Sequence, residues 1–117
     1  MKHIIHADNS DFFRKLMKTF MSEKGLECES FEKGEDAVNA VAEGRATFVI
    51  TGLSLADMSG EEFLKRLMTL PQKTPVIVVT SSDESGKHKR LNALGAKSII
   101  LKSGDWKAEL TKILHLD

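Results

Sequence analysis

Short apolar runs alternate with amphipathic stretches along the whole chain. Four runs are apolar throughout, as strands buried on both faces of a parallel sheet are: residues 4–5, 48–50, 76–79 and 99–101. A fifth stretch, residues 26–31, alternates apolar and polar side chains, which is the pattern of an edge strand. The pattern therefore predicts five strands.

Helical patterns fill the gaps between these runs. The first carries apolar side chains at three- and four-residue spacing from Phe13 to Met21, with Ser10 or Asp11 placed to cap its start and Gly25 placed at its end. Further helices are expected over residues 37–42, 63–68 and 85–94, and after Asp105, where the last one carries Trp106, Leu110, Ile113 and Leu114.

This order of elements predicts an α/β fold of five strand–helix units, (βα)5, in one domain over residues 1–117. Strands separated by helices run parallel and are joined by right-handed crossovers. We expect a flavodoxin-like, doubly wound, five-stranded parallel sheet with helices on both faces, a strand order that rests partly on the resemblance described below.

Composition narrows the class of protein. Lys and Arg together number 17, as do Asp and Glu, so no basic excess points to a nucleic acid or a membrane surface. Cys28 is the only cysteine, which excludes a disulfide framework. The first residues are too polar for a signal peptide. These features together predict a cytoplasmic location.

Polar side chains follow three of the predicted strands, at the edge where doubly wound sheets bind ligands. Asp8 and Asn9 follow the first strand, and Thr80 follows the fourth. Lys102 follows the fifth, and Gly52 lies just beyond the third. Because the strands are parallel, we expect these residues to gather in one cleft.

This arrangement resembles the receiver domains of bacterial response regulators of the chemotaxis (CheY-like) type, over nearly the whole chain. A receiver has an acidic pair after its first strand, a phosphate-accepting aspartate after its third, Thr or Ser after its fourth and Lys after its fifth. The acceptor lies eight residues before a glycine, in a loop of the type Asp-x-x-x-Pro-x-x-Asp-Gly. Gly60, followed by Glu-Glu-Phe-Leu, and Gly95-Ala96 also match.

The resemblance, carried over residue by residue, leaves an inherited pocket without its acceptor. Asp8 matches the first acidic residue, Thr80 and Lys102 match, and Asn9 replaces the second acidic residue. Counting eight back from Gly60 places Gly52 at the acceptor position. Ala56 and Ser103 replace two prolines of the family pattern, so the departures are scattered like natural drift.

These losses bear on chemistry. An acyl phosphate needs a carboxylate nucleophile, which glycine lacks. Mg²⁺ is commonly held by one or two carboxylates, and Asp8 alone remains, so we expect it to pair with Lys102 rather than hold a metal. No cofactor and no enzymatic activity are expected. Asp8 has a second reading, as a local cap for the helix that begins near Ser10.

Other readings of the chain stay open. Asp57 is the remaining carboxylate of the third loop and could substitute as acceptor, although loop carboxylates are most often solvated. A small-ligand-binding doubly wound domain is a further alternative, but neither glycine-rich phosphate loop is present. His3 and His6 are three residues apart on a strand and point to opposite faces, so they do not predict a metal site.

The leading hypothesis is a pseudo-receiver of two-component signalling that acts by phosphorylation-independent protein–protein interaction. By resemblance, the partner is another signalling protein or an effector domain, which meets the fourth helix, fifth strand and fifth helix. That surface would carry Lys87, His88, Lys89, Arg90 and Trp106, an electropositive, partly apolar patch suited to an acidic partner.

Overall fold

Five parallel strands and five helices alternate along the chain in the computed structural model, which describes residues 2–116. The bounds are β1 His3–Ala7, α1 Asp11–Glu23, β2 Glu27–Phe31, α2 Gly34–Ala42, β3 Phe48–Thr51, α3 Gly60–Met68, β4 Val76–Thr80, α4 Ser85–Ala93, β5 Ser98–Leu101 and α5 Trp106–Leu114. The predicted (βα)5 order is confirmed.

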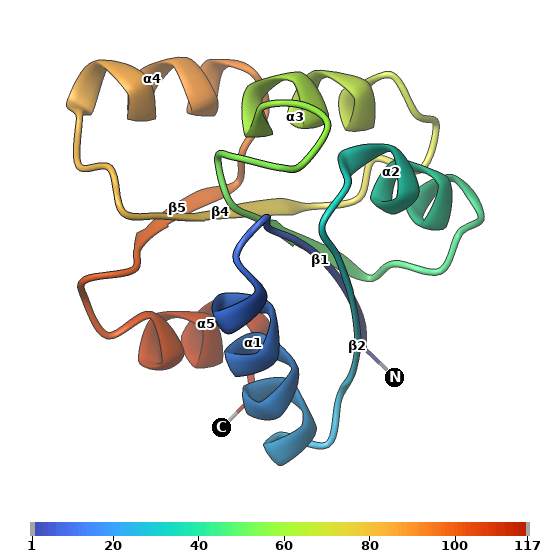
Figure 1. The fold of residues 1–117 in the computed structure, drawn as a ribbon, viewed down its shortest axis with the longest axis vertical. Coiled ribbons are helices and arrows are strands. Elements are labelled where there is room, and N and C mark those ends of the chain that lie inside the picture. The colour runs from blue at the N-terminus through green and yellow to red at the C-terminus, as the bar shows by residue number, and fades with distance from the viewer. Residues whose placement is uncertain (1, 117) are drawn as a thin grey trace.

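The strands form a single sheet in the order β2-β1-β3-β4-β5. The chain moves outward in one direction from β1 to β2 and then in the other direction from β3 to β5, so the order reverses between β1 and β3 (Figure 1). In doubly wound sheets a ligand crevice lies outside the carboxyl ends of the strands at such a reversal. The flavodoxin-like prediction is therefore confirmed.

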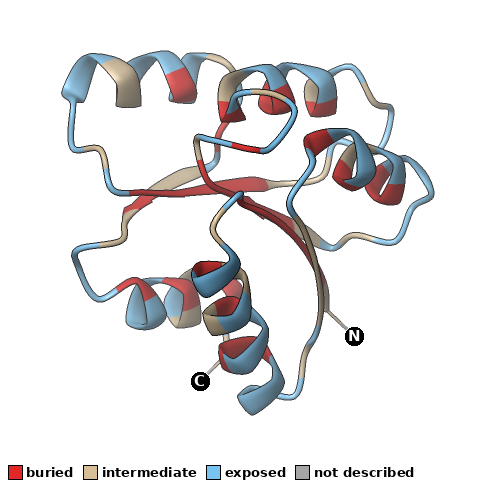
Figure 2. Ribbon diagram, in the orientation of Figure 1, coloured by how far each residue is buried: buried red, intermediate tan, exposed pale blue. Residues whose placement is uncertain are grey.

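Two apolar cores lie on opposite faces of the sheet, because successive side chains of a strand point to opposite sides. Ile5 and Val49 belong to the core beneath α2, α3 and α4, whereas Ile4 and Ile50 belong to the core against α1 and α5. Figure 1 shows the two helical layers on either side of the sheet, and Figure 2 shows buried residues along the inner side of each layer.

Helix ends are stabilised where the sequence predicts caps. The Ser10 side chain accepts a hydrogen bond from the Phe13 N–H at the start of α1, and Asp105 accepts one from Ala108 at the start of α5. Gly25, with φ of +74°, turns the chain after α1 in a conformation that favours glycine. No helix within residues 2–116 is long and apolar enough to traverse a bilayer.

Trp106 is buried, which corrects its assignment to an exposed partner surface. Its side chain is only 9% exposed and packs against two aromatic rings of α1. The ring centroids of Phe13 and Phe20 lie 5.1 and 5.5 Å from that of Trp106. A tryptophan in the first turn of a surface helix is covered here because α1 lies beside α5 on the same face of the sheet (Figure 1).

Truncation of Trp106 should destabilise the fold. Trp106→Ala removes the indole that joins α5 to α1, and such core truncations typically cost about 3–5 kcal/mol in the free energy of unfolding. Phe12→Ala is the matched control, because Phe12 is 73% exposed, and it should change that free energy by less than about 0.5 kcal/mol. Urea denaturation followed by circular dichroism measures both, and equal effects would contradict the assigned burial.

Candidate functional site

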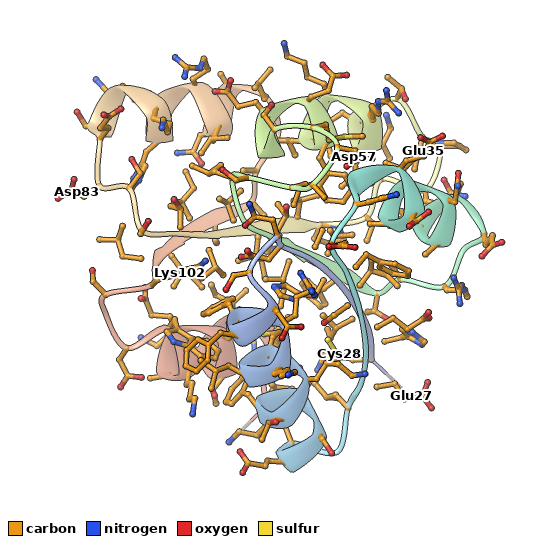
Figure 3. All side chains as sticks on the ribbon, in the orientation of Figure 1. Glu27, Cys28, Glu35, Asp57, Asp83 and Lys102 are labelled. Atoms are coloured by element: carbon orange, nitrogen blue, oxygen red, sulfur yellow. The ribbon has the colours of Figure 1, made fainter. Side chains whose placement is uncertain are left out.

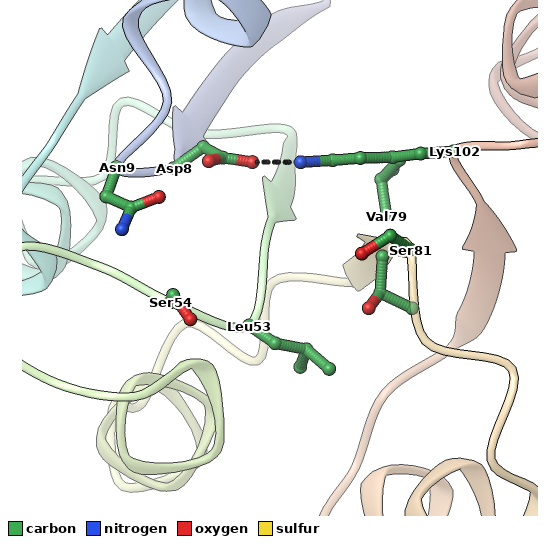
Figure 4. Close-up of a pocket in the computed structure, with 8 residues that line it drawn as sticks. Asp8, Asn9, Leu53, Ser54, Val79, Ser81 and Lys102 are labelled. Atoms are coloured by element: carbon green, nitrogen blue, oxygen red, sulfur yellow. Dashed lines mark hydrogen bonds and ion pairs between the residues drawn. The ribbon is translucent and has the colours of Figure 1, made fainter.

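A polar cleft of about 190 Å³ lies at the carboxyl ends of the strands. Asp8 and Asn9 come from the end of β1, Thr80 from the end of β4 and Lys102 from the end of β5. The structure thus brings together four of the five residues that were expected to gather here, whereas Gly52 is not among the lining residues. The role of the four residues stays a prediction. Figure 4 shows them with the other lining residues, which are Leu53, Ser54, Val79 and Ser81.

An ion pair between a buried carboxylate and a partly exposed ammonium crosses this cleft. The Lys102 ammonium donates to Asp8 Oδ2 over 3.0 Å, as the dashed line in Figure 4 marks. Asp8 is 3% exposed, and its other oxygen, Oδ1, accepts a hydrogen bond from the Ser10 N–H at 2.9 Å. Ser10 itself caps α1, so Asp8 holds the turn before the helix and pairs with Lys102. Lys102 also lies 4.2 Å above the Phe13 ring centroid, a cation–π contact.

Gly52 leaves a space that Asp8 occupies. A Cβ atom at residue 52 would lie 2.6 Å from Asp8 Oδ2 and 3.0 Å from Asp8 Cγ, which is far inside van der Waals contact. The backbone at Gly60 also lies close to this segment, because a side chain at residue 60 would collide with the Gly52 carbonyl oxygen. The glycine spacing noticed in the sequence therefore reflects a close approach of two backbone segments.

The remaining lining groups are neutral. Thr80 is buried, and its hydroxyl oxygen accepts a hydrogen bond from the Ser82 N–H at 3.0 Å. Asn9 has an exposed side chain, while its backbone N–H donates to the Ser54 carbonyl at 3.1 Å. This last bond ties the end of β1 to the loop between β3 and α3, which forms one wall of the cleft.

The donor set does not fit Mg²⁺, the ion that the resemblance implies. Mg²⁺ in proteins is usually bound by carboxylates, phosphate oxygens and water. Among residues 2–116, Asp8 is the single carboxylate that lines the cleft, and its two oxygens already accept hydrogen bonds from Ser10 and Lys102. Within residues 2–116, no three His, Cys, Asp or Glu side chains gather in a metal-binding arrangement.

Asp57, the alternative acceptor, faces away from the cleft. Its carboxylate accepts hydrogen bonds from the backbone N–H groups of Gly34 and Glu35, at 2.7 and 3.1 Å, and so caps the start of α2. Slight burial acts to raise the pKa of Asp57, but the bonds from Glu35 and Gly34 outweigh it and lower the pKa. Figure 3 shows Asp57 beside Glu35 and far from Lys102.

His6 is a buried neighbour of the site that the sequence analysis treated only as an unlikely metal ligand. It is fully buried; Nδ1 lies 3.2 Å from the Ser30 hydroxyl, and Nε2 has no hydrogen-bond partner among the described residues. Burial lowers the pKa of His6 to about 4; Asp8 opposes this shift, and the charges of Lys102 and Arg14 add to it. The sequence feature that could have revealed this buried group is a histidine inside an otherwise apolar strand.

The response regulator receiver domain family matches residues 4–115. The chain belongs to this family. A protein-glutamate methylesterase/protein-glutamine glutaminase of Bacillus subtilis is 30% identical over 118 residues, a match that covers 97% of this chain and 33% of that protein. The transcriptional regulatory protein YkoG of the same species, itself uncharacterized, is 27% identical over 69% of this chain and 36% of its own length. The chain thus spans about a third of these curated relatives.

Solved receiver structures share the fold. The BeF₃-activated receiver domain of Klebsiella pneumoniae RstA is similar with a TM-score of 0.88 at 21% identity, covering 98% of both chains. The Vibrio cholerae chemotaxis protein CheY4 is similar with a TM-score of 0.85 at 22% identity, covering 100% of this chain and 99% of that one. Because the receiver family matches residues 4–115, this chain is a two-component receiver module. Receiver domains generally signal without enzymatic activity, by contacting other signalling proteins or effector domains.

A side chain at residue 52 should strain this receiver. Gly52→Ala places a methyl group in contact with Asp8 Oδ2, so the carboxylate has to leave its position beside Lys102, at a cost of about 1–3 kcal/mol in the free energy of unfolding. Gly86→Ala is the control, because nothing lies within 4 Å of its Cβ position in α4, and it should be neutral or slightly stabilising. Chemical denaturation measures both, and a Gly52→Ala protein as stable as the wild type would contradict the occupied space.

The free energy of unfolding should fall as the pH drops from ~6.5 to about 4, because His6 takes up its proton more readily in the unfolded chain. Above pH ~6.5 the imidazole is neutral in both states, and below that value only the unfolded chain takes up the proton, until about pH 4. The free energy of unfolding should fall by up to ~1.4 kcal/mol per pH unit in this window. Denaturation curves from pH 7 to 4 measure the slope, which should be shallower in a His6→Val protein. Parallel slopes would show that His6 does not titrate differently on folding.

Proposed function

We propose that this receiver signals by binding another protein and forms no acyl phosphate at residue 52. The observation that carries the proposal is the space at Gly52, which holds the Asp8 carboxylate instead of an acceptor side chain. A receiver of this kind transmits information through its surface contacts alone.

The charge balance of the cleft supports the proposal. Acyl phosphate formation brings a dianionic group to a carboxylate, and a divalent cation normally offsets that charge. Here Lys102 is the only cation among the described residues that line the cleft, and Asp8 neutralises it across 3.0 Å. A phosphoryl group would have to displace Asp8 from Lys102 before it gained any compensating positive charge.

The two alternatives find less support in the geometry. Asp57 is engaged with the Gly34 and Glu35 N–H groups and is not part of the cleft lining, so a phosphoryl group on it would uncap α2. The cleft, at about 190 Å³, is smaller than the ~300–1,000 Å³ of pockets that hold drug-sized ligands. This cleft is therefore too small to enclose a nucleotide.

The partner surface expected from the resemblance needs revision. Lys89 and Arg90 are exposed and Lys87 is half-buried, so these three side chains of α4 can meet an acidic partner. Trp106 cannot contribute, because it packs between Phe13 and Phe20. The proposed surface is therefore electropositive and centred on α4.

Incubation with acetyl phosphate and Mg²⁺, followed by intact-mass measurement, tests the proposal. We expect no mass increase of one phosphoryl group under conditions that label an aspartate-bearing receiver run in parallel. An adduct that hydroxylamine removes would refute the proposal. Its absence from an Asp57→Asn protein would then identify Asp57 as the acceptor.

A further inference from the structure

A second groove, of about 200 Å³, lies between α4 and the segment that leads into α3. Leu53 is its apolar component, Ser59 and Glu61 line it from the start of α3, and Lys87 and Arg90 line it from α4. The groove is on the α2–α4 face of the sheet, opposite the face that α1 and α5 cover (Figure 1). The groove shares Lys87 and Arg90 with the expected partner patch but extends toward α3, away from α5.

The helix on one side of the groove, α4, buries few side chains, although burial of an apolar face is what usually stabilises a helix. Leu91 is the one fully buried residue of α4, and most of the helix is exposed in Figure 2. The helix has no acidic residue, and four consecutive positions carry basic or imidazole side chains, from Lys87 to Arg90. Such a helix presents charge to an exterior partner more than it supports the core.

The cations of the groove are only partly compensated. Arg90 Nε is paired with Glu61 Oε1 across the groove. Lys87 and Lys89 form no ion pair with any residue of the 2–116 range. A ligand with a carboxylate therefore finds one free ammonium at the groove, at Lys87, and one guanidinium that is already shared, at Arg90.

From these observations we infer that the α3–α4 groove is the docking site of an acidic peptide segment of a partner protein, with one apolar side chain on Leu53 and neighbouring carboxylates on Lys87 and Arg90. The inference rests on the proposed function and specifies the site and the chemistry of its partner. Glu61 is then a built-in competitor, because it holds the guanidinium that the partner's carboxylate needs.

Other occupants fit the groove less well. Its volume is below that of pockets for drug-sized ligands, so it accepts a side chain rather than a nucleotide. Duplex nucleic acid is bound through many phosphate contacts, and Glu61 and Glu62 at the start of α3 would repel them. A peptide places its apolar and acidic groups a few ångströms apart, which matches the distribution of Leu53 and the cations.

Nuclear magnetic resonance titration of the ¹⁵N-labelled chain tests this docking. The probes are blocked hexapeptides Asp-Glu-Leu-X-Asp-Glu, with Leu, Ile, Phe or Met at X, and their charge-neutral counterparts Asn-Gln-Leu-X-Asn-Gln. We expect saturable shift changes at Leu53, Ser59 and Lys87 with the acidic peptides, weakened by salt, and none with the neutral ones.

Three variants sharpen the test. Lys87→Glu should weaken binding about tenfold, because it replaces an attraction with a repulsion. Lys112→Glu makes the same charge change on α5 and should alter the affinity less than twofold, which separates a local contact from net charge. Glu61→Gln should tighten binding about threefold, since it frees Arg90.

The following outcomes would overturn the inference. It is wrong if all acidic peptides fail to bind at millimolar concentration, if the shifts lie on β5 and α5, or if Lys87→Glu and Lys112→Glu weaken binding equally. Displacement of the peptide by a duplex DNA at lower concentration would make nucleic acid the occupant. None of these results bears on the phosphodonor experiment, so the inference and the proposed function can fail separately.

Discussion

The ion pair between Asp8 and Lys102 joins the first and last strands of the sheet at their carboxyl ends. Asp8 is almost fully buried, and a buried carboxylate that loses its partner is strongly destabilising, by about 3–5 kcal/mol in comparable cases. The pair is possible in this geometry because Gly52, between the two strands, has no side chain to push the Asp8 carboxylate away. The pairing of charges in the cleft therefore depends on the lack of a side chain at residue 52.

The loop between β3 and α3 is secured from both sides. The Asn9 N–H holds the Ser54 carbonyl, and Asp57 caps α2 from a position more than twenty residues away in the chain. The Met58 sulfur lies against Gly34, so closely that a side chain at residue 34 would collide with it. These contacts hold the loop in place as a wall of both the cleft and the α3–α4 groove. Its one carboxylate, Asp57, accepts hydrogen bonds from the backbone of α2.

The two ends of the expected partner surface have different environments. α5 faces α1 and contributes Trp106 to a cluster of aromatic rings, which makes that end part of the core. α4 has a single buried residue and a series of basic side chains, which makes it the more exposed end. This difference supports the proposal that partner recognition centres on α4 and its neighbour α3, on one face of the sheet.

The sequence by itself determined the order of the elements and which polar residues meet at one edge of the sheet. Short apolar runs such as residues 76–79, set between helical patterns, are typical of interior strands of a parallel sheet. Parallel strands bring Asp8, Thr80 and Lys102 to the same edge. Local caps such as Ser10 were also readable, because they depend on neighbours within one turn. The pairing of Asp8 with Lys102 could be expected from the sequence, because the resemblance places both residues in one cleft. Only the tertiary structure decided how Asp57 and Trp106 are used. The partners of Asp57 lie 22 and 23 residues away, and those of Trp106 lie on another helix, so no local pattern contains them.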